Sequence, residues 1–275
     1  MCETTAAVDQ HAETAKAART AGTAQTAQTA QPRTERTAPP AHGPSRARNL
    51  VALALGLLPP YLFVVLARLG QGRGFTVLEM VLYPLVVGTA SLVSMLVLLR
   101  YFCGEPISAL NRRGGSLLRD SAVGLALAVA FVLFSLVSEP LLTRLVTPRR
   151  NAEGMTLIVG LIRNPLLLVV WFGPVLWIGV AAFEEVARVF CITRVMSVWP
   201  GAAGRWGAVA ASTAAFGLMH YYQGPAGIIS SGVMGLACAL LYVWRGRIWP
   251  LIVGHALFDA WSIGMAMVMV SRAMR

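Results

Sequence analysis

The chain has 275 residues, of which 56% are hydrophobic and only 13% charged, and its mean hydropathy is +0.65. Soluble domains carry about a quarter charged residues, so this composition argues against a soluble domain and predicts a membrane protein. The net charge of +11 does not indicate nucleic-acid binding, because the arginines lie singly or in pairs between apolar runs, as in loops that face anionic lipid.

The first 48 residues differ in composition from the rest of the chain. They are rich in Ala, Thr, Gln and Pro and contain the repeat TAQTAQTAQ. Such a segment buries too little apolar surface to offset its ordering entropy, which predicts a disordered tail at 1–48. It has no apolar run ahead of a cleavage site, so it is not typical of a secretory signal. The folded domain is therefore expected at 49–275.

Apolar segments follow one another from residue 49 onward. About 20 apolar residues in a helix cross the hydrocarbon core, where the backbone must satisfy its own hydrogen bonds. Seven segments qualify or nearly so: 49–68, 77–99, 118–138, 164–193, 206–222, 224–244 and 248–270. The predicted fold class is all-α, a polytopic membrane bundle of about six to eight transmembrane helices. The segment 206–222 is short for a full crossing, and the Pro59-Pro60 pair is expected to kink the first segment.

The basic residues between the segments favour a cytoplasmic N-terminus. In that orientation the inner segments hold Lys16 and 13 arginines, and the outer ones hold eight arginines. The chain is therefore expected to be a multi-pass protein of the cell membrane, with the lipid bilayer as its surroundings. The four cysteines are scattered, without the paired spacing of a zinc knuckle or a disulfide framework.

A small set of ionisable residues lies inside or close to the apolar segments of the C-terminal half. The set comprises Glu184, Glu185, Arg188, His220, His255 and Asp259. Such residues are costly in hydrocarbon, usually face the bundle interior, and indicate functional sites. The other two histidines, His11 and His42, lie in the tail. We therefore expect the six side chains, from three helices, to meet in one site.

The chemistry of these residues fits the hydrolysis of an amide. A carboxylate beside an imidazole in a dry pocket can activate water, and a second histidine can donate to a developing oxyanion. His255 and Asp259 are four residues apart and share a helix face. Glu184 and Arg188 have the same spacing, so an ion pair between them is available. Each group also has a purely structural interpretation, as packing residues, an ion pair or a hydrogen bond between helices.

Three motifs on these helices resemble those of a known family. They are EEVAR at 184–188, FGLMH at 216–220 and HALFD at 255–259. In this order they resemble the Glu-Glu-x-x-x-Arg, Phe-x-x-x-His and His-x-x-x-Asn or Asp motifs of the CPBP (ABI) intramembrane proteases, which include the Rce1-like CAAX prenyl endopeptidases. The resemblance covers about residues 164–265, a protease-like core within the membrane domain.

The resemblance implies an intramembrane endopeptidase that hydrolyses a peptide bond in a membrane-associated protein or peptide. By position in the motifs, Glu184 is expected to be the general base and His220 its partner in holding the attacking water. His255 and Asp259 are expected to stabilise the oxyanion. The bilayer and the membrane-associated substrate are the only partners that the resemblance implies.

The Glu185–Arg188 pair departs from the family pattern. The arginine follows the second glutamate by three residues, whereas the family usually has four. These two residues are expected to orient the groups that contact the substrate. The changed spacing affects their expected roles more than that of Glu184. The family has been described both with and without a metal. If a divalent metal such as zinc is present, Glu184, His220 and His255 are the expected ligands.

Two other classes of function are compatible with the sequence. The changed arginine spacing also fits a catalytically inactive CPBP-like membrane scaffold or an immunity-type protein. Carboxylate and histidine chains also relay protons in ion- or proton-coupled transporters. Against a transporter, no internal repeat relates the two halves of the chain.

Overall fold

The computed structural model describes residues 44–70, 76–145 and 152–275. Every regular element in these ranges is a helix, which confirms the all-α fold class. The contacts group residues 44–275 into one compact unit. Most of the predicted disordered tail, residues 1–43, lies outside the described residues.

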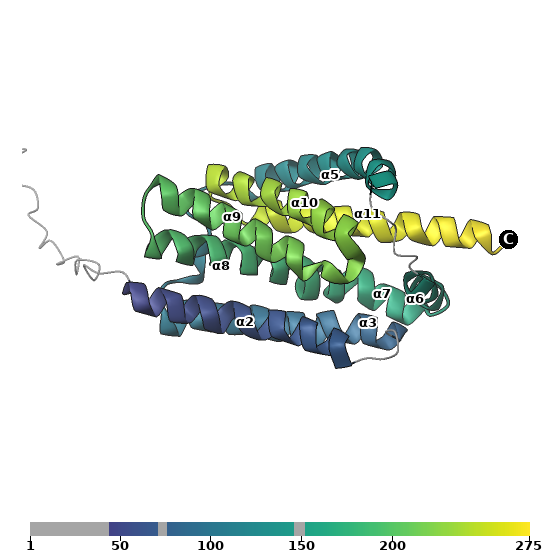
Figure 1. Cartoon of the computed structure of the whole chain (residues 1–275), viewed down its shortest axis with the longest axis horizontal. Helices are drawn as coiled ribbons and strands as arrows, with labels where there is room; N and C mark the ends of the chain where they lie inside the picture. The colour runs from purple at the N-terminus through teal and green to yellow at the C-terminus, as the bar shows by residue number, and fades with distance from the viewer. Residues whose placement is uncertain (1–43, 71–75, 146–151) are drawn as a thin grey trace, which may run out of the picture. The chain divides into compact units, whose positions relative to one another are not determined.

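The elements run in the following order along the chain (Figure 1). They are α2 (Arg46–Gly70), α3 (Val77–Tyr83), η1 (Pro84–Gly88), α4 (Thr89–Val97), η2 (Leu98–Phe102), η3 (Ile107–Leu110), α5 (Leu117–Leu145), α6 (Ala152–Ile162), α7 (Pro165–Val170), η4 (Trp171–Ala182), α8 (Phe183–Val198), α9 (Ala202–Met219), η5 (Tyr221–Gln223), α10 (Gly224–Arg245) and α11 (Trp249–Ala273). Several of them join end to end into longer helices.

Five helical stretches of the described residues are long and apolar enough to cross a membrane. They are Val77–Phe102, Leu117–Leu142, Pro165–Val198, Tyr221–Arg245 and Trp249–Ala273. They coincide with five of the seven predicted segments, so the chain is a multi-pass membrane protein. The other two segments are not among these five: 49–68 lies within α2, and 206–222 covers most of α9 and runs into η5. The cytoplasmic N-terminus stays a prediction.

The first helix begins slightly earlier than the sequence predicted. α2 starts at Arg46, three residues inside the predicted tail. Ser45 caps it, because its hydroxyl accepts a hydrogen bond from the backbone N–H of Arg48 at 3.3 Å. The helix then runs through Pro59 and Pro60 as a single element.

The helix that carries the EEVAR motif changes its winding directly before the motif. η4 is π-helical from Trp171 to Ala182 and contains Gly173, whose backbone is non-helical (φ −90°, ψ −111°) next to Pro174. Pro174 lacks a backbone N–H, which weakens the helix at this point. Regular α-helix resumes at Phe183, and π-helical segments of this kind are common near functional sites.

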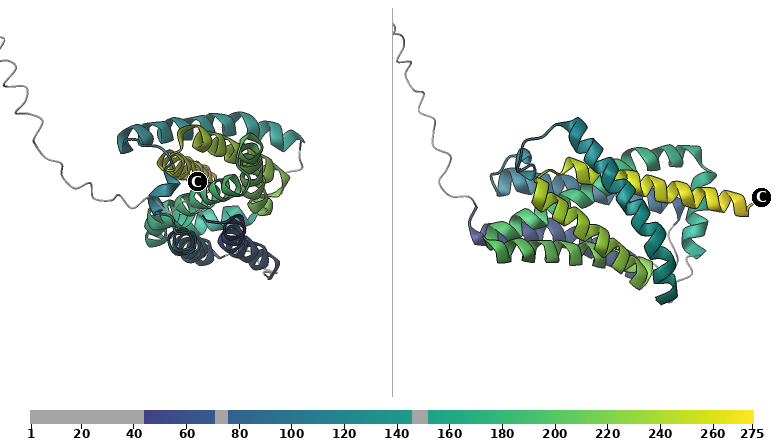
Figure 2. Two further views of the ribbon diagram at one scale, coloured as in Figure 1. Left: turned by 90° about the vertical axis from the view of Figure 1, so that its left-hand side faces the viewer. Right: turned by 90° about the horizontal axis from the view of Figure 1, so that it is seen from above.

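α8 lies at the centre of the helical unit. It packs against α2, α9, α4 and η4, while α9 packs on α10 and α5 on α11. Figure 1 shows α2 and α9 on opposite sides of α8, and Figure 2 shows α5 crossing α11. Twelve of the 16 residues of α8 are buried, including Glu185 and Arg188. These charged side chains therefore face protein rather than lipid.

Two neighbouring helices approach closely through glycine. A Cβ atom on Gly88 of η1 would collide with the backbone of Gly179 in η4, and a Cβ on Gly179 would collide with the carbonyl of Pro84. Small residues allow such backbone contact between helices in lipid. The contact holds η4, and with it the start of α8, against the helix that contains η1.

Candidate active site

Glu185 joins two helices through an imidazole. Its side chain is fully buried on α8, and its Oε1 accepts a hydrogen bond from Nδ1 of His255 on α11 at 2.8 Å. Arg188 donates to the same carboxylate from Nε to Oε2 at 2.8 Å and from Nη2 to Oε1 at 3.1 Å. Because Nδ1 of His255 donates to Glu185, its Nε2 is the nitrogen left for other groups.

Arg188 extends this network to α9 and α10. Its Nη1 donates to the carbonyl oxygen of Gly235 at 3.2 Å, and its guanidinium lies 4.0 Å from the ring centroid of Phe216. A cation over an aromatic face in a dry interior is attractive. A Cβ on Gly235 would lie 2.9 Å from Phe216 Cδ1 and 3.0 Å from Arg188 Nη1. Gly235 therefore provides the space in which the guanidinium sits.

Nε2 of His255 faces two further carboxylates. It lies 3.6 Å from Oε2 of Glu184 and 3.4 Å from Oδ2 of Asp259. The Glu184 side chain is 13% exposed and that of Asp259 is 29% exposed. Three carboxylates from α8 and α11 thus surround one imidazole.

His220 enters the cluster from the C-terminal end of α9. Its Nδ1 lies 2.8 Å from the carbonyl oxygen of Phe216, and a carbonyl only accepts, so Nδ1 carries the hydrogen. In the neutral ring Nε2 is then a free acceptor. The Phe216 ring lies between the two histidines, with ring centroids 4.7 Å from His220 and 6.0 Å from His255. His220 is also close enough to Glu184 for an electrostatic interaction.

A small cavity lies against Glu184, between α2, α8 and α9. Its volume is about 10 Å³, near the lower limit of ~10–15 Å³ for one water molecule. It is lined by Tyr61, Glu184, Ala187, Arg188, Cys191, Ser212, Ala215, Phe216 and Met219. Within the described part of the chain, the buried Oε2 of Glu184 has no hydrogen-bond partner. A buried acceptor without a partner beside such a space is suited to hold a water.

The structure brings the six predicted residues together, but one pairing differs from the sequence expectation. Arg188 forms its ion pair with Glu185, three residues earlier, and not with Glu184. The Oε2 of Glu184 is left free to face the cavity and His255. The difference arises because side chains at i and i+3 also lie on the same helix face.

Two residues of the site were not predicted as such. Tyr61 is a phenol within an apolar helix, and nothing in the local pattern distinguishes it from a packing residue. Gly235 belongs to a stripe of small residues in α10, which alone indicates helix packing. Its contact with Arg188 depends on how α8, α9 and α10 pack together, so the sequence does not predict it.

The expected metal ligands do not form a metal-binding cluster. Within the described ranges, no group of three or more His, Cys, Asp or Glu side chains is arranged to hold a metal ion. His255 already uses Nδ1 for Glu185, and His220 uses Nδ1 for a backbone carbonyl. Nε2 of each ring stays open, and metal-binding histidines commonly engage their other ring nitrogen in this way, so a zinc ion held by Glu184, His220 and His255 stays a prediction.

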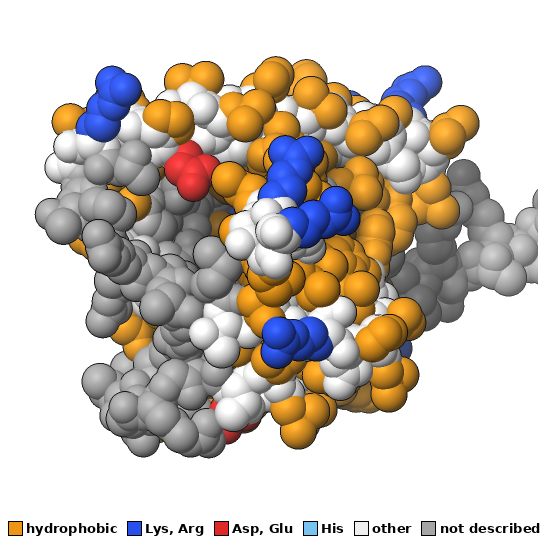
Figure 3. Space-filling view, turned by 90° about the vertical axis from the view of Figure 1, so that its right-hand side faces the viewer, with side chains coloured by type: hydrophobic (Ala, Val, Ile, Leu, Met, Phe, Trp, Pro, Cys, Tyr) orange, Lys and Arg blue, Asp and Glu red, His pale blue; other side chains and the backbone are white. Residues whose placement is uncertain are grey.

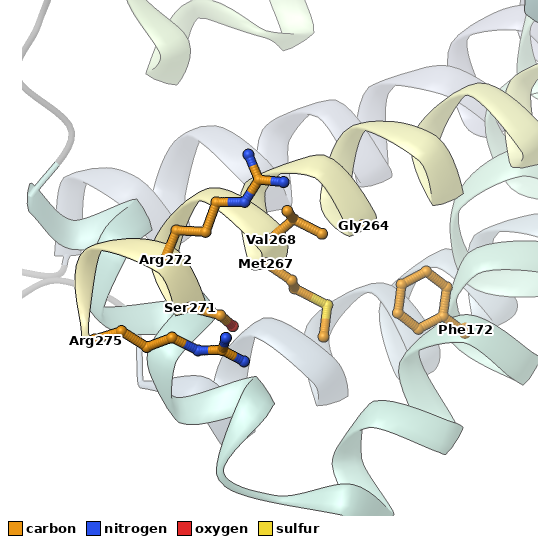
Figure 4. A pocket seen from close by; sticks show the side chains of 7 residues that line it. All are labelled: Phe172, Gly264, Met267, Val268, Ser271, Arg272 and Arg275. Carbon is orange, nitrogen blue, oxygen red and sulfur yellow. The ribbon is translucent and has the colours of Figure 1, made fainter.

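A larger cavity lies elsewhere, at the C-terminal end of α11 (Figure 4). Its volume is about 500 Å³, and none of the six residues lines it. The small cavity beside Glu184 is the better candidate for hydrolysis, because carboxylates and histidines lie together beside it, whereas none of these side chains lines the larger cavity.

Comparison with known proteins agrees with this location. A family model described as type II CAAX prenyl endopeptidase Rce1-like matches residues 165–261. This range contains all six ionisable residues of the site. Searches of curated proteins and of solved structures returned no match.

Proposed function

We propose that the protein is an intramembrane endopeptidase, because a family model described as type II CAAX prenyl endopeptidase Rce1-like matches residues 165–261, which contain the site. Its substrate is a peptide bond in a membrane-associated protein or peptide. The match to this family supports a protease in a bilayer environment. The assignment of each residue to a step is our proposal from the geometry.

Glu184 is the proposed general base. Its free Oε2 and the adjacent water-sized cavity support this role. A water in the cavity donates a hydrogen to Glu184, transfers that proton, and forms the new C–O bond with the scissile carbonyl carbon. The proton then passes to the leaving nitrogen as the C–N bond breaks. His220 supplies a second contact to the water through its free Nε2.

His255 is the proposed oxyanion donor, with Asp259 as its partner. Glu185 holds the imidazole by Nδ1, so Nε2 keeps a fixed direction toward the reacting groups. An N–H at Nε2 donates to the oxygen that becomes negative in the tetrahedral intermediate, and Asp259 stabilises the charge on the ring. Removing one oxyanion donor typically lowers kcat by about 10²–10³-fold.

The changed arginine spacing supports an active site rather than an inactive scaffold. At three residues from Glu185, Arg188 still makes two hydrogen bonds to the carboxylate. A bidentate pair of this kind is the strong form of the arginine–carboxylate interaction. The orienting role therefore tolerates the shift of one residue, and the inactive alternative loses its motivation.

The single observation that carries the proposal is the free, buried Oε2 of Glu184 beside the cavity and 3.6 Å from His255. It is tested by quenched-fluorescence peptides ending in Cys-aliphatic-aliphatic-X, prenylated and unprenylated, with the protein in proteoliposomes. In parallel, new N-termini are identified by mass spectrometry in membranes of cells that express each variant.

We expect wild type and the matched control Glu139→Gln to produce the same new termini and Glu184→Gln to produce none. Glu139 is an exposed carboxylate of α5 outside the site. Cleavage by Glu184→Gln at the wild-type rate, or no wild-type-specific product in either assay, would contradict the proposal.

A further inference from the structure

Tyr61 lies on α2, outside the residues that the family model matches, yet it lines the same cavity as Glu184 and Phe216. Nothing in the three motifs refers to this helix. Its place beside the reacting groups therefore needs its own explanation from the packing of α2.

Contacts along α2 and α8 set the position of Tyr61. Asn49 accepts a hydrogen bond from Nη1 of Arg194 at 2.8 Å, and a Cβ on Gly56 would lie 2.8 Å from Phe190 Cε1. Residue numbers rise along α2 while those of their partners fall along α8, so the helices are antiparallel. From Asn49 to Tyr61 an α-helix rises about 18 Å. The same distance along α8 from Arg194 reaches the turns that contain Glu184.

The Tyr61 hydroxyl is available for a ligand. Within the described residues no hydrogen bond engages it, and it is close enough to Glu184 and Arg188 for electrostatic interaction. Two other polar side chains on the cavity wall already have partners. Arg188 donates to Glu185 and Gly235, and the Ser212 hydroxyl donates to a backbone carbonyl.

We propose that Tyr61 is a catalytic residue that holds the attacking water together with Glu184. The water donates one hydrogen to the Glu184 carboxylate and the other to Nε2 of His220, and one lone pair of its oxygen accepts a hydrogen bond from the Tyr61 hydroxyl. The second lone pair is left for the scissile carbonyl carbon. Only the proton on Glu184 is transferred, and Tyr61 keeps its own. This inference rests on the proposed peptidase function.

The test is Tyr61→Phe, which keeps the ring and removes the hydroxyl. We expect kcat to fall about tenfold or more with KM within about twofold, because positioning of the reacting water is lost while substrate binding is kept. Thermal unfolding in detergent is expected to stay at the wild-type temperature. Tyr101→Phe is the matched control, since Tyr101 is 78% exposed at the end of another span.

The outcomes separate this inference from the proposed function. Wild-type kcat in Tyr61→Phe, with Glu184→Gln inactive, overturns the role of Tyr61 and leaves the peptidase proposal standing. A fall in kcat together with a lower unfolding temperature or a raised KM assigns Tyr61 to packing and also overturns it. An inactive wild type overturns both proposals.

A second candidate binding site is the cavity of about 500 Å³ at the C-terminal end of α11, which is an open groove. Its lining comprises Phe172, Gly264, Met267, Val268, Ser271, Arg272 and Arg275. Phe172 lies at the opposite end of the groove from the two arginines (Figure 4). The groove is therefore apolar at one end and basic at the other.

The two arginines lie where lipid headgroups meet the protein. Arg272 is in the last turn of a helix that qualifies as a membrane span, and Arg275 follows it. No carboxylate in the described ranges pairs with either guanidinium. Figure 3 shows this end of the molecule, where basic side chains lie among hydrophobic ones.

The geometry points to a binding site for an anionic phospholipid. Its phosphate accepts hydrogen bonds from Arg272, Arg275 and the Ser271 hydroxyl, while an acyl chain lies along Met267 and Phe172. The combination of a fixed anion site and an apolar wall matches one lipid molecule rather than a soluble anion. This site is independent of the proposed peptidase activity.

The test compares lipid retained by the protein after extraction from vesicles of phosphatidylcholine with and without phosphatidylglycerol, measured by native mass spectrometry. We expect wild type and the control Arg205→Gln to retain phosphatidylglycerol, and the double variant Arg272→Gln/Arg275→Gln to retain about tenfold less. Millimolar inorganic phosphate is expected not to displace the lipid. Equal retention by the double variant, equal retention of phosphatidylcholine, or displacement by free phosphate would each overturn this site.

Discussion

Replacement of Gly235 by alanine tests how the site is assembled. The new methyl group would lie 2.9 Å from Phe216 Cδ1 and 3.0 Å from Arg188 Nη1, closer than ordinary carbon contacts allow. Overpacking of this kind costs about 1–3 kcal/mol. Alanine also favours a helix over glycine by about 1 kcal/mol. The net loss in the free energy of unfolding is then about 0–2 kcal/mol.

The expected loss of activity is larger than this loss of stability. Arg188 must move away from Phe216 and from the Gly235 carbonyl, and it carries the Glu185 carboxylate that orients His255. Misplacement of a reacting group by about 1 Å can cost about 100-fold in rate. We therefore expect kcat of Gly235→Ala to fall about 10–100-fold in the proteoliposome assay, with the unfolding temperature little changed.

Gly232→Ala is the matched control on the same helix. A Cβ on Gly232 meets nothing within 4 Å, so this variant gains helix propensity without a clash. It is expected to keep wild-type kcat and to unfold at the same or a slightly higher temperature. If Gly235→Ala and Gly232→Ala cleave substrate equally fast, the reasoning that connects Gly235 to the active site through Arg188 is wrong.

Three further predictions follow from the network around His255. Glu185→Ala leaves the buried Arg188 without its partner, so we expect about 3–5 kcal/mol of destabilisation, seen as loss of folded protein in a thermal unfolding assay. Asp259→Asn keeps a polar group beside His255, so activity is expected to persist at a reduced level. Asp259→Leu removes the polar group and is expected to abolish cleavage. Equal cleavage rates in the two variants would refute the role of this position. Because Glu184, His220 and His255 do not form a metal-binding cluster, dialysis against a chelator is expected to leave the cleavage rate unchanged, and recovery of lost activity by zinc would contradict this interpretation.

The membrane class and the six ionisable residues of the site could be predicted from the sequence. Apolar runs of about 20 residues need no tertiary information to be recognised, and five of the seven predicted segments qualify as spans. Charged groups in such runs are costly, so Glu185, Arg188 and His255 stand out against their neighbours. The free-energy cost of a charged group in an apolar segment does not depend on which helices pack together. The sequence alone was therefore sufficient to single out these residues.

The partners of these residues could not be predicted in the same way. Spacing allowed Arg188 to pair with Glu184, but the structure pairs it with Glu185, since Phe216 and Gly235 of two other helices direct the guanidinium. A rotation of about 100° around α8 separates the two glutamates. Which of them faces the arginine and which faces the cavity depends on the neighbouring helices.

What the sequence determined by itself is the environment of each helix, because transfer into lipid depends on the side chains of that helix alone. What only the tertiary structure decided is which groups meet across helices. The antiparallel packing of α2 on α8 brings Tyr61 to the cavity beside Glu184, and no property of the Tyr61 segment indicates this. Contacts between distant segments depend on how helices cross and pack, which is a property of pairs of surfaces rather than of one stretch of chain.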